Sequence, residues 1–185
     1  MKRIIGSVAI CVSLLGVSIR AQAPQGPPTP GPEVQKLGYF VGNWTEKGES
    51  TMHGAVGPVT STQKWEWMPG GFFVVGHLDT KAPMGAFKMM VVEGYDPESK
   101  MYSYTAYDSW GEVITAKGTL SGGTWTWTSE MMMDGKSMKS RVTETELSKT
   151  QYTLKYEWSA DDGSTWTSSM ETTLTKVTAA APAAK

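Results

Sequence analysis

The feature that most constrains this sequence is a two-residue alternation of large apolar and polar side chains. Trp125 and Trp127 alternate with threonines, Trp65 and Trp67 flank a glutamate, and residues 152–158 repeat the pattern with Tyr, Leu, Tyr and Trp. Successive side chains of a β-strand point to opposite faces of a sheet, so the alternation predicts strands with one buried and one solvated face. The chain therefore has to fold as a sheet that buries an aromatic face.

Turn-forming residues divide the chain into short segments of similar length. Clusters of Gly, Pro and Asp lie at residues 54–58, 69–71, 83–85, 96–97, 110–111, 122–123, 134–135 and 161–163. With a break near residues 148–149 they predict about ten strands, the last with Trp166, Met170 and Leu174 on one face. Short connections make neighbouring strands antiparallel, and closing the sheet removes its exposed edges. We therefore predict an all-β fold, a single antiparallel up-and-down barrel of the lipocalin-like kind.

One short helix is predicted ahead of the strands, over residues 33–41. Val34, Leu37 and Val41 fall on one helical face, and Pro32 suits a first turn. After it, every segment through residue 177 has the strand and turn pattern.

A membrane-spanning barrel is the competing β interpretation. It would need a continuous apolar band facing lipid. The face opposite the aromatic residues instead carries charged side chains, namely Lys64, Glu66, Lys155, Glu157 and Glu171. If the aromatic face met lipid, little would remain to fill the lumen, so a barrel that does not span a membrane is favoured.

The start of the chain is expected to be a signal peptide, residues 1–23. Lys2 and Arg3 are followed by an apolar run too short for a comfortable span, and cleavage is expected after Ala21 or Ala23. An uncleaved anchor is the alternative. A Pro-rich leader (24–32), the barrel (33–177) and a disordered Ala/Pro tail (178–185) would follow, which predicts a secreted protein, periplasmic or extracellular.

The single cysteine and the net charge exclude several kinds of site and partner. The single cysteine, Cys11, lies in the signal, so a processed chain would have no disulfide, thiolate metal site or cysteine nucleophile. An exported protein without disulfides points to a bacterial source. Loss of Lys2, Arg3 and Arg20 takes the formal net charge from −1 to −4 and leaves no basic cluster. Nucleic acid and anionic membranes are therefore not expected partners.

No catalytic residue, metal site or cofactor is predicted. His53 and His77 lack metal-ligand spacing, and the consecutive methionines 131–133 would point to alternate faces of a strand. The acid pairs Glu144 with Glu146 and Asp161 with Asp162 are expected at the surface, where such pairs are commonest.

Two motifs indicate structure rather than chemistry. Gly42-Asn43-Trp44, after a short helix, is similar to the first-strand G-x-W signature of lipocalins, in which the tryptophan closes one end of the barrel. Residues 159–166 fit the S-x-D-x-G-x-T-W pattern of an Asp-box hairpin, in which the aspartate caps the turn. Sialidases repeat that motif, whereas this short chain has one copy.

Further sequence segments, taken in order along the chain, resemble those of a known protein family. Trp67-Met68-Pro69-Gly70-Gly71-Phe72, Gly94-Tyr95-Asp96, Tyr107-Asp108-Ser109-Trp110-Gly111, Arg141 and the closing Asp162 to Trp166 with Met170-Glu171 follow the G-x-W segment in order. Together they resemble the bacterial domain-of-unknown-function family 1579, from about residue 33 to 176. The resemblance implies a lipocalin-like (calycin) barrel and no established activity. The related haem-binding nitrobindins use a histidine late in the chain, and no histidine follows His77 here, which argues against haem.

The favoured function is the binding of a small, mostly apolar molecule in the lumen, since about ten strands enclose more volume than eight. An enzyme using the same lumen, with Asp108 as base and Arg141 as anion clamp beside Tyr95, is the first alternative. A filled barrel with a surface interaction role is the second. The candidate ligand-binding residues are Trp65, Trp67, His77, Tyr95, Asp108, Trp125, Trp127, Arg141 and Tyr156. Arg141 or His77 is expected to orient a polar end of the ligand.

Overall fold

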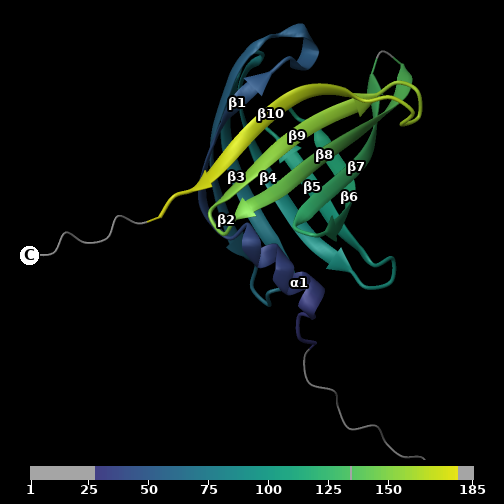
Figure 1. Ribbon diagram of the computed structural model, residues 1–185. Helices are drawn as coiled ribbons and strands as arrows, with labels where there is room; N and C mark the ends of the chain where they lie inside the picture. The colour runs from purple at the N-terminus through teal and green to yellow at the C-terminus, as the bar shows by residue number, and fades with distance from the viewer. Residues whose placement is uncertain (1–27, 134, 179–185) are drawn as a thin grey trace, which may run out of the picture.

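A computed structural model of the chain describes residues 28–133 and 135–178. The predicted signal peptide, residues 24–27 of the leader and residues 179–185 of the tail lie outside the described residues, as do Asp134 of one predicted turn and the side chains of His53 and Met133. The described residues form a closed antiparallel barrel of ten strands with one short helix at one end (Figure 1). The predicted fold class is confirmed.

Each strand pairs with its neighbours in the chain, and the last strand pairs with the first. The strands are β1 Gly42–Ser50, β2 Gly57–Trp67, β3 Val74–Ala82, β4 Gly85–Asp96, β5 Met101–Asp108, β6 Val113–Ser121, β7 Thr124–Met133, β8 Lys136–Ser148, β9 Gln151–Ser159 and β10 Thr167–Lys176. A short 3₁₀ turn, η2 (Met52–Gly54), lies between β1 and β2. The seam between β1 and β10 closes the barrel, so neither strand is left as a free edge.

The helical segment is shorter than predicted. α1 spans Pro32–Lys36, and a 3₁₀ turn, η1 (Leu37–Tyr39), replaces the expected second helical turn. Pro32 at the start of α1 has no N–H to leave unpaired, as the sequence indicated. The tighter 3₁₀ turn brings the chain directly into β1 at Gly42.

The helical segment closes one end of the barrel (Figure 1). The Tyr39 hydroxyl donates to the carbonyls of Ser148 and Gln151 at the β8–β9 turn. Trp44 is 1% exposed, and its indole N–H donates to the Phe40 carbonyl at 2.6 Å. The G-x-W segment therefore has the structural role that the sequence predicted for it. We call this the plugged end, and the opposite end, where the β1–β2 and β9–β10 connections lie, the open end.

The alternation in β10 is interrupted by a bulge. The pairing of β10 with β9 shifts register between Ser168 and Met170. Met170 and Leu174 keep the inward face, whereas Trp166 lies on the outer face beneath the guanidinium of Arg141, 4.2 Å from its ring centre. The prediction that Trp166 shares a face with Met170 is therefore wrong, because the bulge adds one residue to the strand.

The predicted Asp-box is present at the β9–β10 turn. The Asp161 carboxylate accepts hydrogen bonds from the Thr165 N–H at 2.8 Å, the Thr165 hydroxyl and the Ser159 hydroxyl. These donors lower the pKa of Asp161 to about 2. Gly163 has a φ of +89°, and Trp166 packs beneath it. These contacts hold the hairpin together.

Candidate functional site

The lumen is packed tightly at the plugged end. Phe40 reaches the rings of Trp65, Trp125 and Tyr152 at centroid distances of 5.8, 5.1 and 5.7 Å. These four side chains are at most 5% exposed. Aromatic edge and tilted contacts of this kind add to the stabilisation from burial itself. This half of the inward face forms the hydrophobic core of the protein.

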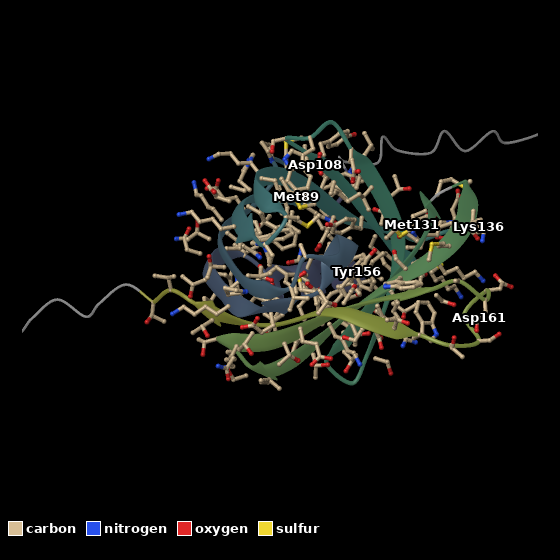
Figure 2. All side chains as sticks on the ribbon, turned by 90° about the horizontal axis from the view of Figure 1, so that it is seen from above. Met89, Asp108, Met131, Lys136, Tyr156 and Asp161 are labelled. Atoms are coloured by element: carbon tan, nitrogen blue, oxygen red, sulfur yellow. The ribbon has the colours of Figure 1, made fainter. Side chains whose placement is uncertain are left out.

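At greater distance from the plug, the inward face of the barrel is less completely buried. Inward-pointing side chains in the middle and open half of the barrel retain accessible surface, among them Leu78, Met89, Tyr104, Met131, Val142, Leu154, Tyr156 and Met170. Figure 2 looks onto the open end and shows Met89, Met131 and Tyr156 there, with Lys136 and Asp161 further out on their hairpins. The same strands thus bury one half of their inner face fully and leave the other half with apolar surface to cover.

Three carboxylates point into the lumen from strands spaced around the barrel, and a fourth, Glu146, points inward nearer the plugged end. Glu46 comes from β1, Glu93 from β4 and Glu144 from β8, so two or three strands lie between each and the next around the barrel. Glu46 is 5% and Glu93 2% exposed. We refer to Glu46, Glu93 and Glu144 as the lumen carboxylates.

Glu46 is fully hydrogen-bonded. One of its oxygens accepts from the Gln63 amide at 3.0 Å and the other from the Thr172 hydroxyl at 2.7 Å. The Gln63 carbonyl in turn accepts from the indole N–H of Trp65 at 2.9 Å. Three neighbouring strands, β10, β1 and β2, therefore share one satisfied network.

Glu144 and its neighbour Glu146 pair with the two tryptophans of β7. The indole N–H of Trp127 donates to Glu144 at 2.9 Å, and that of Trp125 donates to Glu146 at 2.8 Å. The two indole rings are stacked 6.1 Å apart. The expectation that Glu144 and Glu146 form a surface acid pair is therefore wrong, because their strand register turns both side chains inward.

Glu93 is the unsatisfied member of the set. Its Oε2 is buried and has no hydrogen-bond partner among the described residues. Its cross-strand neighbours are Val74 on β3 and Tyr104 on β5, and Val74 offers no side-chain donor. Leaving a buried polar atom unpaired costs roughly 1–3 kcal/mol. The other buried side-chain atom without a partner among the described residues is Oγ of Ser169, at the bulge of β10, so Glu93 is the one such carboxylate.

Burial raises the pKa of all three lumen carboxylates. The pKa of Glu144 is raised to about 7, chiefly by burial. The hydrogen bond from Trp127 lowers this pKa, and the nearby charge of Glu46 raises it. Burial, together with the charge of Glu144, sets the pKa of Glu93 well above its ordinary value. Burial also raises the pKa of Tyr104, with Glu93 and Glu144 adding to the effect. Carboxyl groups that face one another in a low-dielectric lumen resist simultaneous ionisation.

No cation offsets these carboxylates within the described lumen. Two described cations are in phase with the inward face of β1 to β10: Lys136, exposed at the tip of the β7–β8 hairpin, and Lys176, at the plugged rim. The ammonium group of Lys176 donates to the Tyr39 carbonyl and lies 5.0 Å from the centre of the Trp44 ring. The middle of the lumen is therefore an apolar surface interrupted by acceptor groups.

The four predicted ligand-binding tryptophans all point inward. Trp65 and Trp125 belong to the packed core under the plug, and Trp67 lies against η1, where a Cβ on Gly38 would be 3.3 Å from its ring. Trp127 lies one step further along β7 and reaches the Glu144 carboxylate. Of the four, Trp127 is the one whose indole N–H donates to a lumen carboxylate.

The two predicted tyrosines lie at opposite ends of the lumen. Tyr95 packs edge-on against Tyr102 at 5.0 Å, and the Tyr102 hydroxyl donates to Glu33 of α1, so Tyr95 belongs to the plugged end. The Tyr156 hydroxyl lies 3.4 Å from the sulfur of Met131 in the open half.

His77 and Arg141 were predicted to orient a ligand in the lumen, and the structure corrects this prediction for both. His77 is exposed on the outer face of β3, between Lys64 and Met90 of the neighbouring strands, where it borders an open surface depression of about 460 Å³. Arg141 binds Glu157 on the outer face, at 2.7 Å, and covers Trp166. Strand register points both side chains away from the lumen, so neither can orient a ligand there.

Asp108 has a structural role in the β5–β6 turn. One of its carboxylate oxygens accepts from the backbone N–H groups of Trp110 and Glu112, at 2.9 and 2.8 Å. Figure 2 shows it at the rim of the open end. Asp108, Arg141 and Tyr95 thus lie at the rim, on the outer face and at the plug, and the structure does not bring them together into an acid–base site.

The sequence could have indicated the lumen carboxylates through strand register. In Met89-Met90-Val91-Val92-Glu93 the glutamate shares its face with Met89 and Val91, and Glu144 shares a face with Val142. A carboxylate in phase with apolar residues is the signal. It was outweighed by the general rule that acidic side chains lie at surfaces.

The described residues contain no group of three or more His, Cys, Asp or Glu side chains placed to hold a metal ion. The helices in this part of the chain are too short or too polar for any of them to cross a bilayer.

Comparison with known proteins gives a family and a fold. The family model described as "Protein of unknown function (DUF1579)" matches residues 29–176. No curated protein matches the chain. Among solved structures, the S-type phycobiliprotein lyase CPES from Guillardia theta is similar over 78% of this chain and 92% of that chain, with 9% identity and a TM-score of 0.53. At that identity the likeness shows a shared barrel fold alone.

Proposed function

The chain belongs to the DUF1579 family of proteins of unknown function, and we propose that it binds a small, mostly apolar molecule in the lumen of its barrel. The molecule would enter at the open end, since α1 and η1 cover the other end. Exposed residues of the β1–β2 and β9–β10 connections would surround its path.

The difference in burial along the inner face carries this proposal. Leu37, Trp125 and Leu174 at the plug are fully buried, whereas Met89, Val142 and Tyr156 on the same inward face are only partly buried. A barrel of ten strands encloses more space than one of eight. Sparse polar groups in an apolar lining are typical of small-molecule sites.

The similar solved structure adds general support. Its name describes a lyase that acts on phycobiliproteins, and it shares this barrel fold at 9% identity. That protein is an enzyme, and an enzyme acting on a small molecule in the lumen is therefore kept as the alternative, without the residues first suggested for it. The position of Asp108 in a turn and of Arg141 outside the barrel removes the acid–base pair that the sequence suggested.

We also propose that the protein is exported and processed. This rests on the sequence of residues 1–23, with its basic start, apolar run and small residues at 21 and 23. N-terminal sequencing of protein from the exported fraction is expected to begin at Gln22 or Pro24. Finding Met1 at the start of that protein would contradict processing.

A lumen-filling substitution tests the binding proposal. Val142→Trp adds a large ring to the inner face of β8, and Thr143→Trp adds the same ring to the outer face one residue later. Nile red, a neutral lipophilic dye, is titrated into each protein while its fluorescence and the tryptophan emission are followed. We expect saturable binding by the wild type and Thr143→Trp, and a loss of about tenfold or more in affinity for Val142→Trp.

The outcomes separate lumen binding from surface adsorption. Equal loss in both variants, or no saturable binding by the wild type, would contradict the proposal. Circular dichroism of each variant confirms that it is folded before the affinities are compared.

A further inference from the structure

We infer that the ligand carries a cationic nitrogen with N–H donors, such as a protonated amine, and that Glu93 and Glu144 bind this group in the middle of the lumen. The inference rests on the proposed lumen binding and specifies the class of ligand. It departs from the sequence-based expectation, in which a cationic or imidazole side chain of the protein would meet a polar end of the ligand.

The lumen offers hydrogen-bond acceptors to a ligand. A carboxylate is an acceptor only, and the lumen carboxylates are acceptors from three different strands. Glu46 is satisfied by Gln63 and Thr172. Glu144 accepts one indole N–H, from Trp127. Glu93 has a buried oxygen that no described side chain or backbone group reaches.

The described strands around Glu93 and Glu144 supply no cation beside these two carboxylates. Among the described residues of β3 to β9, the one Lys, Arg or His in phase with the inward face is Lys136, which is exposed at the tip of the β7–β8 hairpin, eight residues along β8 from Glu144 (Figure 2). Buried carboxylates are ordinarily paired with a cation or several donors. Here the missing donor has to come from water, from protonation of the carboxyl group, or from a ligand.

Aromatic rings surround the two carboxylates. Tyr104 lies directly across from Glu93 on β5, and the ring of Trp127 lies 5.6 Å from that of Tyr104. Aromatic faces next to carboxylates suit an organic cation, because the rings attract the positive charge and cover the apolar part of the molecule. An anionic ligand would find no cationic partner among the described side chains in the middle of the lumen and would be repelled by each lumen carboxylate that is ionised.

Three molecules with the same chain and different heads test the inference. Octylamine, octanol and octanoate place a cation, a neutral hydroxyl and an anion on one apolar tail. Their affinities are measured at pH 7 by displacement of Nile red and by calorimetry. We expect octylamine to bind about tenfold or more tightly than octanol, and octanoate to bind more weakly than octanol.

Conservative variants test whether the preference for octylamine over octanol depends on Glu93 and Glu144. Glu93→Gln and Glu144→Gln keep the size of the side chain and remove its charge, and Glu66→Gln makes the same change on the exposed outer face of β2. We expect each lumen variant to reduce the preference for octylamine over octanol by about tenfold, with octanol affinity retained as evidence of an intact lumen. Glu66→Gln should keep the wild-type preference.

The failures of the two proposals can be told apart. Equal affinity for octylamine and octanol, or an unchanged preference in both lumen variants, would overturn the inference about the cation and leave lumen binding standing. Absence of saturable binding for all three molecules and for Nile red would overturn the proposed function itself.

Discussion

The plugged end and the open end of this barrel are made by the same ten strands, yet they bury their inward side chains to different extents. At the plug, an aromatic cluster around Phe40 and Trp44 is closed to solvent and its indole N–H groups have partners. Towards the open end the inward face keeps accessible apolar surface. One half of the barrel therefore forms the packed core that stabilises the fold, while inward side chains of the other half are not fully committed to that core.

The largest expected effect is at the plug. Phe40→Ala removes the ring that contacts Trp65, Trp125 and Tyr152, and should lower the free energy of unfolding by ~3–5 kcal/mol. Met89→Ala, on the partly buried inner face of β4, should cost about 1 kcal/mol because less surface is lost from contact. Urea unfolding followed by tryptophan fluorescence measures both. Equal losses would show that the two halves are packed alike.

The next largest effect is a pH dependence of stability, caused by Glu144 between the plugged end and the open end. The folded-state pKa of Glu144 is about 7, above the value of about 4.5 expected in the unfolded chain. Its stabilising contribution is therefore complete below pH 4.5 and is lost as pH rises through 7. For this group the loss is at most about 3 kcal/mol. Thermal unfolding between pH 5 and 8 should show a falling midpoint, with a smaller fall for Glu144→Gln than for the wild type. A midpoint that rises over this range in the wild type but not in Glu144→Gln would contradict the direction.

A smaller effect is expected at the rim of the open end. Asp161→Ala removes the acceptor that holds the Thr165 backbone and hydroxyl, and should lower the unfolding midpoint by a few degrees. Nile red affinity should be unchanged, because the Asp161 side chain is engaged within its own hairpin. A matched change at Asp162, whose side chain pairs with the partly exposed Lys139, should have less effect. If both variants unfold at the wild-type temperature, the turn does not depend on its cap.

The smallest effect is expected on the outer face. His77→Ala should leave the free energy of unfolding within about 0.5 kcal/mol of the wild type and the Nile red affinity unchanged, because the imidazole is exposed and points away from the lumen. A loss of binding in this variant would show that the surface depression beside His77, and not the lumen, takes up the dye.

The fold followed from the sequence because its signals are local. Alternation of Trp and Thr in residues 124–128, turn residues at regular spacing and the G-x-W segment each depend on a few neighbouring positions. The bulge near Ser169 was missed for the same reason, since no local residue marks it and its effect is to turn Trp166 outward.

The candidate site could be predicted from the sequence only in part, because it depends on pairings between distant strands. Trp127 was expected inside the lumen, but its partner Glu144 was expected at the surface. Whether Glu93 and Glu144 face the same space is decided by barrel closure, which relates β4 to β8 through the intervening strands. Arg141 and His77 were placed in the lumen on chemical grounds, and a change of one position in register is enough to reverse the face of a side chain.

The seam between β1 and β10 has a consequence for how the chain folds. Nine of the ten strand pairings join consecutive strands and can form as hairpins, whereas the seam joins Thr45 to Thr175, 130 positions later. Forming such a contact requires most of the chain to be ordered first, so closure carries the largest entropic barrier. In any state in which the seam is open, β1 and β10 are two unpaired edges able to pair with other molecules. The speed of seam closure relative to encounters between chains therefore sets the concentration at which this protein refolds without aggregating.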